Sequence, residues 1–206
     1  TNAIAKYETG KMIPSSQNLI AIANALNFDV DYFFKPFDIK IDFNNFEFRK
    51  RSSLPSKEEA SIKEKISLSI EKYIEIENIA NDNKIISFDY KSKLLSTDND
   101  ARAIASQVRE DLNLGIDCIS TPIEVLENNG IKVIEIDASN KFDGSCVKIS
   151  DIPIIVLNKN MISERRRLTL FHELAHLILE FDPKADTERL CNVFANEILL
   201  PSAVLK

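Results

Sequence analysis

The sequence lacks four features that would place it in particular classes of protein. It has no hydrophobic run of membrane-spanning length and no recognisable secretion signal. Its three cysteines, Cys118, Cys146 and Cys191, show no disulfide-like spacing, which is typical of a reducing compartment. The net charge of −6 is not that of a general nucleic-acid binder, so any contact with DNA must be local. We therefore expect a cytoplasmic protein without a membrane span.

Histidine is equally scarce, and its placement is the most informative feature of the chain. The only two histidines, His172 and His176, are four residues apart, and Glu173 directly follows the first. Residues i and i+4 share one face of a helix, so both imidazoles can reach a single metal ion. Zn²⁺ in a catalytic site keeps one position open for water, and Glu173 is placed to take a proton from that water. This HExxH pattern predicts zinc-dependent peptide hydrolysis.

The residues around the motif predict a buried helix. Residues 168–181 (LTLFHELAHLILEF) are apolar nearly all round, except for a polar stripe that includes both histidines and Glu173. Buried polar groups need partners, and a metal ion supplies one. The alternative is a pair of histidines that are only hydrogen-bonded in a core. We expect Ser163 to cap this helix and Glu180, at its far end, to be solvated.

A three-ligand zinc site needs one more protein ligand, and a second predicted helix over residues 186–200 is its natural source. Leucine, valine, phenylalanine and isoleucine mark the buried face of that helix. Its candidate ligands are the side chains of Asp186, Glu188, Cys191 and Glu197. Spacing alone does not choose among these four.

The segments FHELAHLIL and ERLCNVFANEILLP, preceded by IPIIVLNKN and RRRLTL, resemble the ImmA/IrrE family of metallopeptidases. The resemblance implies that Glu188 is the third ligand, which gives a Zn²⁺ site of His172, His176 and Glu188. It also implies that Asn192 orients a ligand histidine, although an asparagine satisfied by local backbone is the alternative. For Cys191 we expect simple packing.

The segment before the motif predicts a helix and three strands. Thr121 to Glu124 has the pattern of a capping box with proline at the first helical position, and Asn129-Gly130 ends that helix. Residues 131–137 alternate as a strand, and residues 145–149 and 152–158 predict a hairpin. A strand before an HExxH helix commonly forms a sheet edge. Ile154 to Leu157 are therefore candidates for pairing with an extended substrate, unless they form an ordinary buried strand.

These elements together predict an α+β fold of the zincin type. Its small mixed or antiparallel sheet packs on the HExxH helix and its neighbours, after a helix-turn-helix remnant and a long connecting helix. One catalytic part is not evident, because an oxyanion usually needs a donor besides the metal. The candidates are Asn158, Arg165, Arg166 and Arg167, each of which more often forms a solvated face, or a residue beyond Lys206.

Residues 4–34 resemble the latter part of a Cro/repressor-type (XRE) helix-turn-helix domain. The matching pieces are the end of a recognition helix (AIAKYETGK), a loop with Pro14, a helix capped by Ser15 or Ser16, and a short final helix ending at Phe34. In that fold the recognition helix enters the major groove of DNA.

The sequence begins near the start of this recognition helix, so we expect a truncated domain. DNA binding is then possible only through the complete helix-turn-helix, and Asn2 and Lys6 remain as contact candidates, although such residues are usually just solvent-facing. Domains of this type often dimerise, so a homodimer is possible.

The middle of the chain predicts a connector. Residues 39–51 (IKIDFNNFEFRKR) are expected to be an extended or paired segment, and residues 57–78 form a long helix whose isoleucines keep helical spacing. A loop or strand over residues 81–93 and a helix over residues 98–112 follow. We expect a partial helix-turn-helix domain at 1–36, a connector at 37–95 and a metallopeptidase domain at 96–206.

The sequence as a whole predicts a zinc endopeptidase with Glu173 as its base. The resemblance implies limited cutting of a repressor-like protein partner and a link to transcriptional control. One alternative is a helix-turn-helix regulator or antitoxin whose peptidase-like domain senses metal or ligand without cutting. A third possibility is a structural zinc site closed by Cys191.

Overall fold

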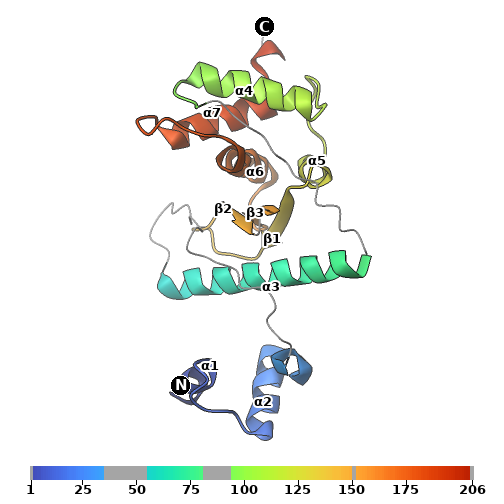
Figure 1. Ribbon diagram of the computed structural model, residues 1–206, viewed down its shortest axis with the longest axis vertical. Coiled ribbons are helices and arrows are strands. Elements are labelled where there is room, and N and C mark those ends of the chain that lie inside the picture. Colours follow the sequence, from blue (N-terminus) through green and yellow to red (C-terminus); the bar gives the residue numbers. More distant parts are fainter. Residues whose placement is uncertain (1, 35–54, 81–93, 150–151, 205–206) are drawn as a thin grey trace. The chain divides into compact units, whose positions relative to one another are not determined.

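The computed structural model describes residues 2–34, 55–80, 94–149 and 152–204 (Figure 1). Contacts divide the chain into two compact units, Thr1–Lys40 and Ile41–Lys206. No helix in the described part is long and apolar enough to cross a membrane. The extended segment expected at residues 39–51 and the loop or strand expected at 81–93 lie outside the described residues.

The N-terminal unit contains the three short helices that the sequence predicts. They are α1 (Asn2–Glu8), α2 (Ser16–Leu26) and a 3-10 helix, η1 (Val30–Phe34). The hydroxyl of Ser15 caps α2 by accepting the backbone N–H of Asn18 at 3.3 Å. The side-chain amide of Asn18 donates to the hydroxyl of Tyr7 at 3.2 Å, which joins α2 to α1. Lys6, a candidate DNA contact, is exposed on α1.

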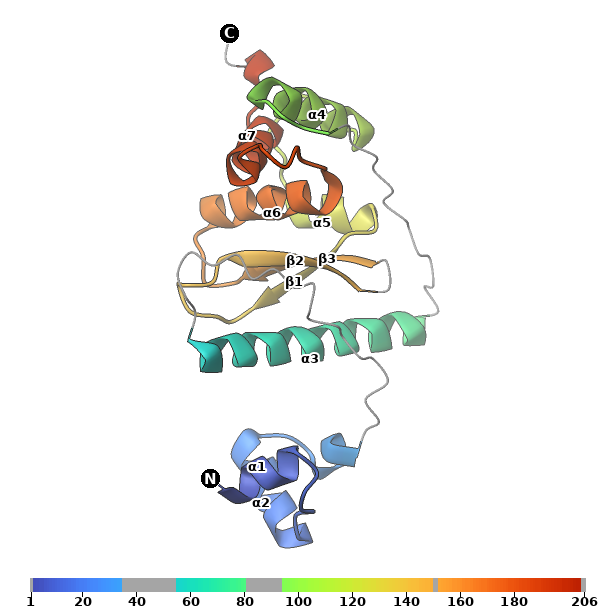
Figure 2. The same ribbon diagram turned by 60° about the vertical axis from the view of Figure 1, so that its left-hand side comes forward.

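The larger unit is built in layers (Figures 1 and 2). Its elements are α3 (Ser56–Ala80), α4 (Asp98–Asp111), α5 (Pro122–Asn128), β1 (Lys132–Ile136), β2 (Gly144–Ile149), β3 (Ile152–Asn158), α6 (Ser163–Ile178), α7 (Thr187–Leu199) and a short 3-10 helix, η3 (Ser202–Val204). Helix α3 covers one face of the sheet and α6 lies on the other, with α7 and then α4 beyond α6. The HExxH helix is therefore enclosed between the sheet and α7.

The sheet is mixed, with the strand order β1-β3-β2. Strand β3 pairs in parallel with β1 and antiparallel with β2, which confirms the predicted hairpin. Because β3 is paired on both sides, Ile154 to Leu157 are not at an edge, and the expectation that they pair with a substrate is wrong. Among the described residues, β1 and β2 form the edges of the sheet.

Two hydrophobic clusters meet at this sheet. Ile154 and Val156 pack in the cluster that includes α3, whereas Ile155 and Leu157 pack in the cluster that includes α6. A strand that is buried on both faces has apolar residues at nearly every position, which explains the apolar sequence IPIIVLN of β3. The sheet thus depends on both helical layers.

Two predicted helix caps are wrong. Helix α5 begins at Pro122, but Thr121 makes no side-chain capping bond, and its ψ of 69° lies outside the extended region usual for a cap. Helix α6 begins at Ser163 itself, so Ile162, with φ −63° and ψ 153°, occupies the capping position. Both helices therefore begin without a side-chain cap.

Gly144 gives a test of the contact between the sheet and α6. A Cβ added at Gly144 would lie 2.8 Å from Thr169 Cγ2 and 2.9 Å from the carbonyl oxygen of Val156. We expect Gly144→Ala to lower the free energy of unfolding by about 1–3 kcal/mol, measured by urea denaturation, because overpacking forces neighbours to move. Adding Thr169→Ser removes the methyl group and should restore part of the loss.

The matched control for Gly144 is Lys148→Ala on the same strand. Lys148 is exposed, so its replacement should change stability by no more than about 0.5 kcal/mol. Equal stability of Gly144→Ala and the wild-type protein would show that this contact is not tight.

Candidate metal centre

The C-terminal half of helix α6, which carries the HExxH motif, is largely buried. Leu170, Phe171, Leu174 and Ala175 are each at most 1% exposed, and Glu173 is 2% exposed. The helix ends at Ile178, three residues before the expected end at 181, because Leu179 is already extended. Glu180 is exposed, as expected for a residue beyond the helix.

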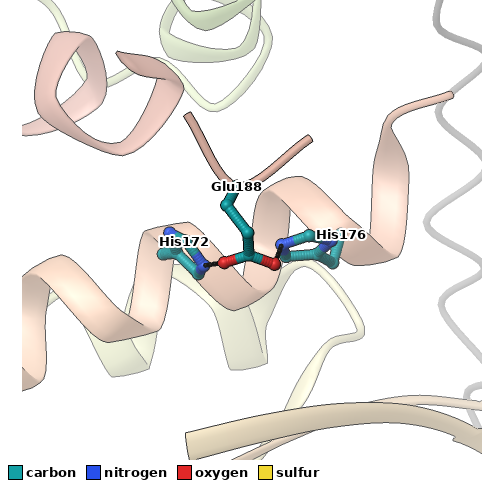
Figure 3. Close-up of side chains that lie close together, drawn as sticks. All are labelled: His172, His176 and Glu188. Atoms are coloured by element: carbon teal, nitrogen blue, oxygen red, sulfur yellow. Dashed lines mark ion pairs between the residues drawn. The ribbon is translucent and has the colours of Figure 1, made fainter. Parts of the chain in front are cut away.

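The two histidines converge with Glu188 (Figure 3). The rings of His172 and His176 have centroids 5.1 Å apart. The Nε2 atom of His172 lies 3.4 Å from Glu188 Oε2, and that of His176 lies 3.9 Å from Glu188 Oε1. One ligand atom from each of the three residues lies within 4.8 Å of the others. In Figure 3 the carboxylate lies between the two rings.

Helix α7 brings Glu188 to this place. The side chain of Asp186 caps α7 by accepting the backbone N–H of Arg189, so Glu188 lies in the first helical turn. Helix α7 packs along α6, with Leu190, Phe194 and Ile198 buried. The carboxylate itself is 64% exposed, which leaves one side of the group open.

The other three ligand candidates on α7 are engaged elsewhere. Asp186 is the helix cap, and Cys191 is fully buried in the hydrophobic core. The carboxylate of Glu197 accepts the backbone N–H of Ser202 at 2.8 Å and its hydroxyl at 2.6 Å. Among the described residues, the group of side chains that could hold a metal ion consists of His172, His176 and Glu188. Of the four candidate ligands on α7, only Glu188 belongs to this group. This arrangement disfavours a structural zinc site closed by Cys191.

Asn192 contacts the site from one turn further along α7. Its Oδ1 atom lies 2.9 Å from Nδ1 of His172. A hydrogen bond there requires the proton on Nδ1, which directs the lone pair of Nε2 toward Glu188. The side chain is therefore placed to fix the tautomer of His172.

The residues present fit a zinc ion. Two imidazoles and one carboxylate are the donor set of many catalytic zinc sites, which leave a fourth position for water. Donors about 2.0–2.1 Å from a tetrahedral ion lie roughly 3.3 Å apart. The separations of 3.4 and 3.9 Å involve different oxygens of Glu188, and one donor atom from each of the three residues lies within 4.8 Å of the others, so the three side chains are near enough to share one ion.

The four candidate oxyanion donors all have other contacts. Arg165 pairs with Asp143 at 2.6 Å, and Arg166 pairs with Glu135 at 2.9 Å. Arg167 donates to the carbonyl of Ile119, and the buried amide of Asn158 donates to the carbonyls of Ser139 and Phe142. These contacts connect the four side chains to loops and to the sheet. None of the contacts is made with a candidate metal ligand.

Sequence reasoning missed two contacts beside the site. The ring of Phe181 lies 5.9 Å from that of His176, inclined by 45°. Arg189, next to Glu188, pairs with Asp98 at 2.9 Å. The hydrogen bond from Arg189 and the charge of Asp98 hold the pKa of Arg189 above its ordinary value. No local pattern signals either contact, since both depend on how distant segments meet.

Comparison with known families gives two matches. Residues 126–206 match the M78 peptidase family model, described as the IrrE N-terminal-like domain. Residues 1–33 match a helix-turn-helix family model. No curated protein matches the chain. The first match contains the complete His172, His176 and Glu188 group, and the second contains α1, α2 and most of η1. Residues 1–33 are thus similar to a helix-turn-helix domain, and residues 126–206 are similar to an M78 peptidase domain of the ImmA/IrrE type.

Proposed function

We propose that this protein is a zinc-dependent endopeptidase that makes limited cuts in a repressor-like protein and thereby acts on transcription. The observation that carries the proposal is the convergence of Glu188 on the two histidines of HExxH, with Glu173 buried on the same helix. A purely structural zinc site would not need the acidic residue at position 173.

The roles of the side chains follow from their positions. A bound Zn²⁺ supplies Lewis acidity, which polarises a carbonyl and makes water acidic near neutral pH. His172, His176 and Glu188 would hold the ion, and Asn192 would keep His172 in the required tautomer. Glu173 would take a proton from the attacking water and later pass it to the leaving amine.

The repressor-like partner is proposed from the chain's own organisation and from the family resemblance. A helix-turn-helix segment in the same chain suggests that the protein acts where related DNA-binding proteins act. The net charge of −6 limits direct DNA binding to a local surface of that segment, so a protein substrate remains the main partner.

One observation favours a second candidate function, a regulator that binds metal or ligand without cutting. All four side chains considered as oxyanion donors make contacts with residues other than His172, Glu173, His176 and Glu188. A sensor would bind metal through the same three residues but would not need Glu173. The first experiment below separates the two functions.

Replacing Glu173 tests catalysis directly. We expect Glu173→Gln to abolish cleavage of candidate repressor proteins while it retains about one zinc ion per chain by elemental analysis, because an amide cannot take the proton. Glu164→Gln, at an exposed position in the first turn of the same helix, is the matched control and should remain active. Loss of zinc in Glu173→Gln would contradict its assignment as a base, and tight zinc without cleavage by the wild-type protein would favour the sensor.

Replacing Glu188 tests the third ligand. Replacing a residue that hydrogen-bonds a metal ligand typically weakens metal binding by roughly 10- to 100-fold. Because Glu188 would be a ligand itself, we expect Glu188→Ala to weaken zinc binding by more than this. Cys191→Ala should keep its zinc, because Cys191 is buried in the core. Zinc affinity measured by competition with a chelator checks both, and zinc that depends on Cys191 would instead indicate a closed structural site.

Replacing Asn192 tests the orientation of His172. We expect Asn192→Ala to lower zinc affinity by about 10- to 100-fold, because the tautomer of His172 is no longer fixed. Asn192→Asp keeps an oxygen acceptor and should retain tight binding. If Asn192→Ala binds zinc as tightly as the wild-type protein, the contact at 2.9 Å does not position the ligand.

A further inference from the structure

A segment before α4 is bonded to the loop that joins α6 to α7. The backbone N–H of Leu95 donates to the carbonyl of Glu180, and the carbonyl of Leu95 accepts the N–H of Asp182, both at 2.9 Å. This parallel bridge places Leu95 opposite Phe181. The side chain of Leu95 is 1% exposed within the core. The loop backbone is therefore fixed on both sides of Phe181.

Phe181 in turn contacts one of the candidate ligands. Its ring lies 5.9 Å from that of His176 and packs partly against the core. His176 lies in the last turn of α6, which ends at Ile178. An aromatic ring held at this distance limits how the imidazole can turn.

The same segment reaches Glu188 through α4. Asp98, in the first turn of α4, pairs with Arg189 at 2.9 Å. The backbone N–H of Arg189 is bound by Asp186, so both its side chain and its main chain are held. Because the side chain of Glu188 is 64% exposed, its position depends on this turn of α7.

We propose that residues 95–98, which we call the strap, position His176 and Glu188 for metal binding. This inference rests on the proposed zinc site. Helix α6 alone sets the spacing of the two histidines, whereas the 3.9 Å between His176 and Glu188 separates two different helices. The strap contacts one residue next to each ligand. Leu95 pairs with Phe181, whose ring contacts His176, and Asp98 pairs with Arg189, which follows Glu188 in the sequence. Ligand geometry of this kind needs support from surrounding residues.

The ion pair is tested with Arg189→Gln and Arg189→Lys. Zinc affinity is measured by competition with a chromophoric chelator, and the stability of the metal-free protein by urea denaturation. We expect Arg189→Gln to bind zinc about two- to fivefold more weakly, as for loss of an exposed ion pair, and Arg189→Lys to bind as the wild-type protein does. High salt should reduce the difference between Arg189→Gln and the wild-type protein.

The matched control is Lys63→Gln, which removes an ion pair of similar length, 3.0 Å to Glu59, on α3. It should leave zinc affinity unchanged. This control shows whether the loss of any surface ion pair alters zinc binding, in which case the Arg189 result would not support the strap.

The aromatic contact is tested with Phe181→Leu and Phe181→Tyr. Leucine keeps an apolar side chain but removes the ring, so we expect zinc binding about tenfold weaker, with little change in metal-free stability. Tyrosine keeps the ring and should retain affinity.

The outcomes separate the strap from the site itself. If the wild-type protein binds zinc and every Phe181 and Arg189 variant binds equally tightly, the strap has no positioning role, although the proposed site stands. If affinity falls only in proportion to metal-free stability, the strap is merely structural and the inference is overturned. A wild-type protein that binds no zinc contradicts the proposed function.

Discussion

The structure depends on the burial of α6 between the sheet and α7. This helix packs apolar side chains on both neighbours, yet it also carries Glu173 at 2% exposure and two partly buried histidines. Polar groups in such a place are costly unless they have suitable partners. Glu188 and Asn192 approach the histidines from α7, and a metal ion would complete the arrangement. The position of α7 therefore decides whether the site can form.

Helix α4 holds α7 at both ends. Asp98 pairs with Arg189 near the start of α7, and Arg109 donates to the carbonyl of Ile198 near its end. The guanidinium of Arg109 also donates to the carbonyls of Gly115 and Asp117 at 2.8 Å. Burial lowers the pKa of Arg109 from its ordinary value, but these carbonyl contacts compensate the buried cation. Since α4 and α7 also pack along their lengths, they form one support for Glu188.

The sequence predicted the parts of this arrangement that follow from local geometry. The four-residue spacing of the histidines required only a helix. Glu188 was different, because spacing left four candidates and only the family resemblance selected one. Its approach to the histidines depends on the packing of two helices, and the contact of Leu95 with the loop at Phe181 depends on segments far apart in the chain. Neither can be read from periodicity.

Some wrong expectations had a signal in the sequence and some did not. The apolar run of β3 has almost no polar alternation, which is typical of a strand covered on both faces and argues against an edge. The caps at Thr121 and Ser163 had suitable residue types, but the backbone at Thr121 and the earlier start of α6 removed their roles. Residue type favours a cap, whereas the backbone angles decide it.

The sheet also explains why α3 belongs to the same compact unit as the candidate metal site. Ile62, Ile66 and Ile70 are each at most 2% exposed against the face of the sheet opposite α6. Burying one such side chain contributes about 1.5–3 kcal/mol, so three of them are a large part of the stability of a small domain. Lys132 on β1 also pairs with Glu77 and lies 4.2 Å from the ring of Tyr73, both on α3. Without α3 the mixed sheet would expose an apolar face, and β3, which lies below α6 in Figure 2, would lose the contacts that cover Ile154 and Val156. The helix that the sequence presents as a connector is thus one of the layers that support the candidate metal site.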